Sequence, residues 1–143
     1  MKLKNNNGFT LIEALFAALL LGLVVAALAA ASGAVTMANG YGVDLSTAEF
    51  LIEEVRELTA NVGFDTLKAM YDGQTFSPPV DIMGAELSDF GAFSQQITVD
   101  HVQADNLDQI DTGGTSDFVR VTVTVTKNGA PISSTSWIRA RLN

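Results

Sequence analysis

One carboxylate near the N-terminus lies inside an apolar stretch, where an ionised group is costly. Glu13 follows a leader that contains Lys2 and Lys4, and none of the 18 residues from Ala14 to Ala31 has a polar side chain. A charged side chain costs about 2.5–3.5 kcal/mol at the centre of a bilayer and less near its surface. Glu13 therefore either lies at the level of the lipid headgroups or has a specific charged partner.

The rest of the chain offers little that could support catalysis. It contains no cysteine, which excludes disulfides, thiol nucleophiles and thiolate metal sites. The single histidine, His101, follows Asp100, but neither a paired nucleophile nor a G-x-S-x-G motif accompanies them. We therefore predict no catalytic residues, no enzymatic activity and no cofactor. The balance of 8 Lys and Arg against 16 Asp and Glu also argues against nucleic acid as a partner.

The apolar stretch predicts the element that positions Glu13. Together with residues 9–12 it extends over 23 residues, which measure roughly 34 Å as a helix, enough to cross a hydrocarbon core of about 30 Å. A buried core helix fits poorly, because a small domain rarely surrounds a helix that is apolar on every side. A cleaved secretory signal ending at Ala29–Ala31 is a second alternative, although its apolar core would be longer than the typical 7–15 residues or so.

Residues 8–13, Gly-Phe-Thr-Leu-Ile-Glu, follow the short basic leader and precede the apolar stretch. In this arrangement residues 1–35 resemble the N-terminus of type IV pilins and pseudopilins. The resemblance implies that a prepilin peptidase cleaves after Gly8 and N-methylates the new N-terminal residue, Phe9. It also implies that Glu13 neutralises the terminal amine of a neighbouring subunit, so that charge pairing sets the register between subunits.

A pilin-like chain is expected to be a structural subunit. The resemblance implies a subunit of a type IV pilus or of a type II secretion pseudopilus, polymerised through its N-terminal helix with other pilin or pseudopilin subunits by an inner-membrane assembly platform. The basic leader predicts a single-pass inner-membrane precursor with a cytoplasmic leader and a periplasmic head. Many members of the family have a proline near the position of Ala30 and some have a C-terminal disulfide loop; because this chain has neither, the resemblance favours a minor pilin or pseudopilin.

An alternative belongs to another class of protein. A secreted or membrane-anchored binding domain would use the apolar segment only for export. Its mature form would begin at Ser32 rather than at N-methylated Phe9. The mass of the mature N-terminus therefore distinguishes the two hypotheses.

The residues beyond the apolar stretch predict a small head. At 45–62, apolar side chains recur with the spacing of a helix face. Residues 118–126 alternate valines with polar residues, and Asn128-Gly129 predicts a tight hairpin to a partner strand at about 132–142. A third strand is expected at 93–102. We predict an α+β, pilin-like fold, in which a long N-terminal transmembrane and filament-core helix packs on a small antiparallel β-sheet head.

These elements suggest four segments and several side-chain positions. The segments are a leader at 1–8, a transmembrane and assembly helix at 9–35, a helix extension packing on the head at 36–63, and a globular β head at 64–143. Glycines at 33, 40 and 42 leave open whether the helix continues, bends or breaks. In the last strand we expect Ile138, Ala140 and Leu142 on the apolar face, and Trp137, Arg139 and Arg141 on the other. Trp137 is either part of the core or a packing surface between subunits, and the second is favoured because it lies opposite Ile138; the arginines are expected to be strand-surface charges.

Four aspartates occur in one glycine-containing loop of the head. Several pseudopilins bind calcium in such a loop, so the resemblance makes these residues calcium candidates. They are Asp105, Asp108, Asp111 and Asp117. Their spacing does not match an EF-hand, and the simpler prediction is a solvated acidic loop that holds no metal.

Overall fold

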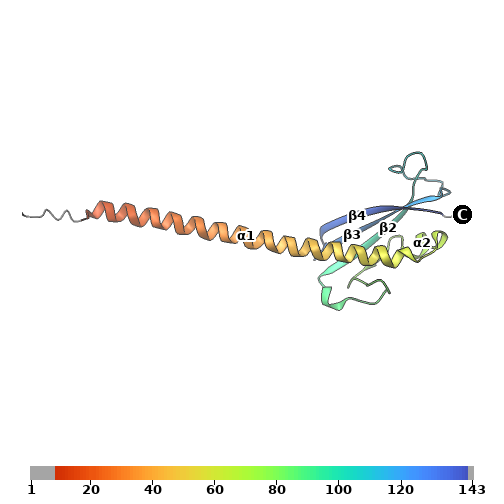
Figure 1. Cartoon of the computed structure of the whole chain (residues 1–143), viewed down its shortest axis with the longest axis horizontal. Helices are drawn as coiled ribbons and strands as arrows, with labels where there is room; N and C mark the ends of the chain where they lie inside the picture. The colour runs from red at the N-terminus through yellow and green to blue at the C-terminus, as the bar shows by residue number, and fades with distance from the viewer. Residues whose placement is uncertain (1–8, 142–143) are drawn as a thin grey trace, which may run out of the picture. The chain divides into compact units, whose positions relative to one another are not determined.

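The computed structural model describes residues 9–141 (Figure 1). The chain divides into two compact units between Gly42 and Val43. Helix α1 (Leu11–Ala60) runs through both units, and all other elements belong to the second. These elements are α2 (Phe64–Tyr71), β1 (Thr75–Phe76), the 3₁₀ helix η1 (Ser88–Phe90), β2 (Phe93–His101), β3 (Phe118–Lys127) and β4 (Ala130–Ala140).

Helix α1 provides all the regular structure of the first unit. It continues as a helix through Gly33, Gly40 and Gly42, so it does not break at these glycines. Every side chain from Phe9 to Val43 is exposed, and most of them are apolar. By length and composition this part of α1 is able to cross a membrane. A helix that is apolar on all sides needs lipid or other helices around it.

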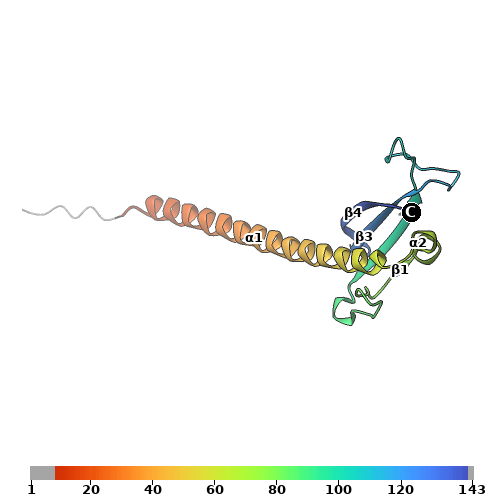
Figure 2. The ribbon, with the colours of Figure 1, turned by 45° about the vertical axis from the view of Figure 1, so that its right-hand side comes forward.

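The second unit is a helix packed on one face of a sheet (Figure 2). Four antiparallel strands lie in the order β1-β2-β3-β4. The valines of β3 alternate with polar residues as predicted, and all four valines lie on the buried face, with Val121 and Val123 fully buried. Opposite them, the buried face of α1 contributes Leu51 and Val55. The predicted α+β fold, with a long N-terminal helix and a small antiparallel sheet, is confirmed.

The hairpin between β3 and β4 forms where the Asn-Gly pair predicted it. Asn128 and Gly129 have φ angles of 51° and 81°, as a two-residue turn with two left-handed positions requires. Close to this turn a bulge between Val125 and Thr126 shifts the register of β4 by one residue. As a result Val121 pairs with Trp137.

The bulge makes the predicted faces of β4 wrong. Without the extra residue, the regular hairpin register would place Ile138 beside Val119 on the core face; with it, Arg139 takes that position. Trp137 therefore packs against the core, with the guanidinium of Arg56 5.0 Å from its ring centroid. Ile138 instead lies on the outer face of the sheet. The predicted end of this strand at residue 142 lies outside the described residues.

The two C-terminal arginines are also not simple strand-surface charges. The guanidinium of Arg139 donates to the carbonyls of Thr59 and Val62 at 2.6 and 2.9 Å, where α1 ends. Arg141 pairs with Asp65 at 2.7 Å and with Asp117 at 3.2 Å. Both side chains therefore connect the end of β4 to neighbouring elements of the same head.

Helix α2 and strand β1 were not predicted. Their sequence lies in a region rich in turn-forming residues, and α2 has only eight residues. Leu67 and Tyr71 of this helix are buried against the core, so tertiary packing stabilises a helix that is too short to be stable alone.

Candidate functional site

The first turn of α1 holds the carboxylate that the sequence singled out. Thr10 precedes the helix and Glu13 is its third residue. The Glu13 Oε2 atom accepts hydrogen bonds from the backbone N–H of Thr10 at 3.1 Å and from its hydroxyl at 3.0 Å. In return, the backbone N–H of Glu13 donates to the Thr10 hydroxyl at 3.3 Å. This is a capping box, in which each side chain satisfies a backbone group that the helix itself leaves unpaired.

The capping box positions Glu13 with one oxygen still available. Both bonds from Thr10 reach Oε2, and within residues 9–141 no hydrogen bond or ion pair to Oε1 is found. An anion in the first turn is also favoured by the helix dipole, since the N-terminal end carries partial positive charge. The sequence already contained the signal, because Thr10-Leu11-Ile12-Glu13 fits the pattern of a capping box. Our sequence interpretation identified Glu13 and missed Thr10.

The predicted cleavage site lies at the border of the described residues. Gly8 lies outside them. Phe9 is 87% exposed and directly precedes Thr10. The exposed apolar side chains begin at Phe9 itself and continue on the helix through Leu11, Phe16 and Leu19. The helix start therefore combines a polar cap with an apolar surface that has no cover within the described chain.

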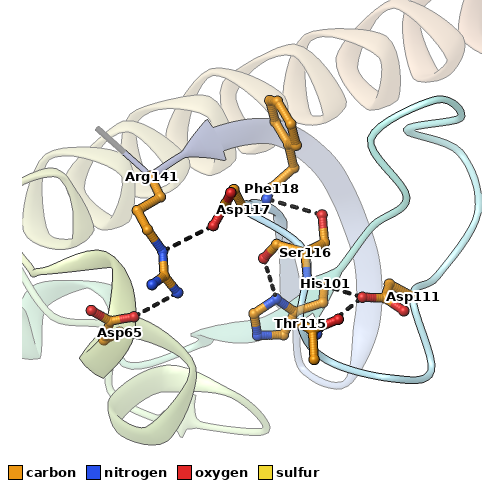
Figure 3. A network of polar contacts seen from close by, with 8 residues as sticks. All are labelled: Asp65, His101, Asp111, Thr115, Ser116, Asp117, Phe118 and Arg141. Carbon is orange, nitrogen blue, oxygen red and sulfur yellow. Dashed lines mark hydrogen bonds and ion pairs between the residues drawn. The ribbon is translucent and has the colours of Figure 1, made fainter. Parts of the chain in front are cut away.

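Two carboxylates of the acidic loop, those of Asp111 and Asp117, bond to the protein itself (Figure 3). One oxygen of Asp111 accepts the backbone N–H of Gly113, and the other accepts those of Thr115 and Ser116, all at 3.0 Å. Asp117 pairs with Arg141. Within residues 9–141, no group of three or more His, Asp or Glu side chains is arranged to hold a metal ion. We propose no calcium site from Asp105, Asp108, Asp111 and Asp117.

The hydrogen bonds of Asp111 change its acidity. The bond from the Gly113 N–H is the largest influence, and those from Ser116 and Thr115 add to it; together they lower the pKa of Asp111 below its ordinary value of 3.8. Desolvation acts in the opposite direction and is outweighed. The carboxylate therefore stays ionised at neutral pH and organises the turn that leads into β3.

His101 serves the same loop. Its Nδ1 lies 3.1 Å from the carbonyl oxygen of Ser116, and its ring packs edge-on against Phe64 with centroids 6.1 Å apart. A carbonyl can only accept, so Nδ1 carries the proton in this contact. The contact of the ring with the Ser116 carbonyl therefore helps to hold the loop in place (Figure 3).

Comparison with known proteins identifies the N-terminal region. Residues 3–29 match the family model of the prokaryotic N-terminal methylation motif, the signature of type IV pilins and pseudopilins. This match covers residues 3–8 of the leader, the capping box and most of the apolar stretch. No curated protein and no solved structure matches the chain.

Proposed function

We propose that this chain is the precursor of a minor pilin or pseudopilin, a structural subunit of a type IV pilus or of a type II secretion pseudopilus. A prepilin peptidase would hydrolyse the bond between Gly8 and Phe9 and N-methylate the new terminus. The mature subunit, residues 9–143, would then polymerise through its N-terminal helix. The methylation motif supports a structural role of this kind.

The observation that carries the proposal is the divided use of the Glu13 carboxylate. Oε2 caps the subunit's own helix, whereas Oε1 is free to accept from another donor. Cleavage creates such a donor, because a terminal amine is largely cationic at neutral pH. Thus the capping bonds can persist while Oε1 pairs with the Phe9 amine of a neighbouring subunit.

The cost of unpaired charge gives this pairing its specificity. In a low-dielectric bundle of helices, an amine or carboxylate without a partner is strongly unfavourable. Each subunit contributes one of each, about one helical turn apart. Neighbouring helices therefore satisfy both charges only at an axial offset that brings one subunit's Glu13 to the next subunit's Phe9.

The exposed apolar surface of α1 is suited to pack against other helices after the subunit has left the lipid. Along residues 9–35 it would first lie in the membrane and later against neighbouring helices. Gly22 and Gly33 leave open space on the helix surface, with no atom within 4 Å of an added Cβ. Small residues of this kind allow close helix–helix approach in apolar surroundings.

The same proposal includes a topology and a set of partners. The leader (1–8) stays in the cytoplasm, residues 9–35 span the inner membrane once, and residues 36–63 carry the helix into the periplasmic head (64–143). The partners are the prepilin peptidase, other pilin or pseudopilin subunits and an inner-membrane assembly platform. The basic leader and the acidic head fit this orientation.

The mass of the mature N-terminus tests the proposal. Purified native protein should begin at Phe9 and carry one added methyl group. A mature form that begins at Ser32 would overturn the proposal, because the assembly helix would then be lost. That result would favour the alternative of an exported binding domain.

Two substitutions of Glu13 separate pairing from capping. Glu13→Gln keeps a side chain that can complete a capping box but removes the charge. Glu13→Ala removes both. We expect both variants to be cleaved normally and to be incorporated poorly into filaments. Normal incorporation of Glu13→Gln would contradict the role of charge pairing.

A further inference from the structure

The two edges of the sheet differ in whether their outward backbone groups are hydrogen-bonded. The first edge is the side of β2 that faces away from β3. In this strand, alternate residues from Gln95 onward direct their backbone groups away from β3. Gln95 pairs with β1, and the N–H and carbonyl of Ile97 bond to Gln74 and Gly73 at 2.9 and 3.0 Å. The carbonyl of His101 accepts from the backbone N–H of Asp111 at 2.7 Å.

An ion pair closes the same edge at Val99. The Val99 N–H donates to Asp72 Oδ1 at 2.9 Å, and its carbonyl accepts from the Lys68 ammonium. Lys68 also pairs with Asp72 at 2.6 Å. Burial raises the pKa of Asp72, but the bonds from Lys68 and from the Val99 N–H outweigh it and leave that pKa lowered. The pair is therefore charged at neutral pH, and the edge of β2 is closed.

Strand β4, at the other edge, has no such cover. The Arg141 N–H donates to Asp117 in the chain segment leading into β3, so the odd-numbered residues of β4 direct their backbone groups inward. The even-numbered ones direct theirs away from the sheet. Across residues 9–141, no group bonds to these outward N–H and carbonyl groups. They belong to Ser134, Ser136, Ile138 and Ala140.

The usual devices that protect an edge strand are also missing from the middle of β4. Exposed edges commonly carry lysine, proline, inward charges or bulges. Here Pro131 and the bulge lie at the hairpin end. From Ile132 to Ile138 there is no charged residue, glycine or proline. Arg139 is an inward charge, but it lies near the far end of the strand, where it bonds to the end of α1.

We propose that the open edge of β4 binds an extended segment of a different protein, which adds a fifth strand and carries a lysine or arginine facing α1. Backbone groups of β4 supply the affinity, as in other cases of strand addition. The charge preference follows from α1, whose Glu49 accepts a hydrogen bond from Ser133 at 2.6 Å beside this edge. Glu53 lies one turn further along, in an exposed pair with Arg56.

A second copy of this chain is a poor occupant of the edge, because residues 132–138 of its own β4 contain no lysine or arginine to meet Glu49. Antiparallel pairing of two β4 strands places a twofold axis across the sheet and reverses the direction of α1 in the partner. Two subunits anchored in one membrane face the same way, which prevents that arrangement. Pairing of β4 with the β2 edge of another copy is blocked by the Lys68–Asp72 pair.

Peptide binding to the full chain in detergent micelles tests the proposal, which goes beyond the proposed function and does not depend on polymerisation. The probe is an eight-residue peptide of alternating lysine and threonine. Amide hydrogen exchange should slow at Ser134, Ser136 and Ile138 when the peptide is added. A peptide of alternating glutamate and threonine should bind roughly tenfold more weakly or not at all.

Two variants provide the controls. Ser136→Pro removes an outward N–H without breaking a bond to β3, whereas Ser136→Ala keeps this N–H. Only Ser136→Pro should abolish the protection of the outward amides by the lysine peptide. Protection of the inward amides of Thr135 and Trp137 reports that the variant is folded. Should the proline variant unfold, Glu49→Lys leaves the edge intact and should weaken binding of the lysine peptide.

Several results would overturn the proposal. These are no protection of the three amides by the lysine peptide, equal protection by the glutamate peptide, and unchanged binding to folded Ser136→Pro or to Glu49→Lys. Protection that appears at high protein concentration without peptide would identify a second copy as the occupant instead.

Discussion

The two parts of helix α1 share one backbone conformation and differ in almost everything around it. Up to Val43 every described side chain is exposed, and the apolar ones occur on all sides. Beyond Asp44, a single stripe is buried against the sheet: Ala48, Leu51, Ile52, Val55 and Thr59. The comparison shows that side-chain pattern, rather than helix propensity, decides whether a helix belongs to a folded head or requires an external apolar environment.

The difference between the two parts of α1 should show most clearly when a buried leucine of the second part is shortened. Leu51 is fully buried, and Leu51→Ala should lower the free energy of unfolding of the head by about 2–5 kcal/mol, because it removes apolar contacts and leaves a cavity. Leu19→Ala, at a residue that is 60% exposed, is the matched control and should leave head stability unchanged. Denaturation of the full chain in detergent measures both. Equal losses would contradict the division of the helix.

The second prediction concerns the polar residue in the core. The Gln95 amide donates to the carbonyls of Leu51 and Val80 at 2.8 and 3.1 Å and accepts from the Val80 N–H at 2.8 Å. Gln95→Ala should cost about 1–3 kcal/mol, because buried backbone groups lose their partner. Gln96→Ala, on the exposed face of the same strand, should change stability by no more than about 0.5 kcal/mol. A similar effect of the two variants would be inconsistent with a stabilising role of the Gln95 side-chain hydrogen bonds.

The third prediction concerns the N-terminal end of α1. Thr10→Ala removes both hydroxyl bonds of the capping box and should destabilise the first turn by about 1 kcal/mol. Faster amide exchange at residues 11–13, with no change in the head, is the expected readout. Thr36→Ala is the control, since the Thr36 hydroxyl bonds to the carbonyl of Ser32 within the helix and caps nothing. Unchanged exchange in Thr10→Ala would argue against the cap.

The smallest expected effect is a local pH dependence in the head. Because the folded state lowers the pKa of Asp111, its ionised form stabilises the 111–116 turn above the ordinary value of 3.8. This contribution is lost as the pH falls through the lowered pKa. Protection of the Gly113, Thr115 and Ser116 amides, measured as exchange relative to the intrinsic rate at each pH, should therefore be lost only at more acidic pH. Asp111→Asn should show faster exchange already at pH 7, whereas Asp108→Asn should not.

Local sequence signals predicted the features that depend on neighbours in the chain. The apolar run, the Gly8–Glu13 motif and the Asn128-Gly129 hairpin each lie within a few residues or form a single helix. Their physical causes, helix burial in lipid and the left-handed positions of a tight turn, are properties of the segment itself. The capping box belongs to this class too, although only its glutamate was recognised.

Tertiary structure decided what depends on contacts between distant residues. One extra residue in the β3–β4 hairpin reversed the faces of β4, so that Trp137 and Arg139 point inward. Hydropathy could not predict this, because both alternating sets of β4 side chains contain an apolar residue and the register depends on a bulge. The short helix α2 exists because its two buried residues pack on β2.

The sequence by itself determined where this protein meets an apolar environment and which end is the candidate for processing, because those properties follow from composition over a continuous stretch. Only the folded structure of the head decided which backbone N–H and carbonyl groups at the sheet edges are hydrogen-bonded and which lack a partner within the described chain. Lys68 and Asp72 close one edge of the sheet from 27–31 residues away in sequence, and nothing comparable reaches the outward groups of β4 within the described chain. Such pairings depend on the register and on the positions of several elements at once, which no single segment encodes.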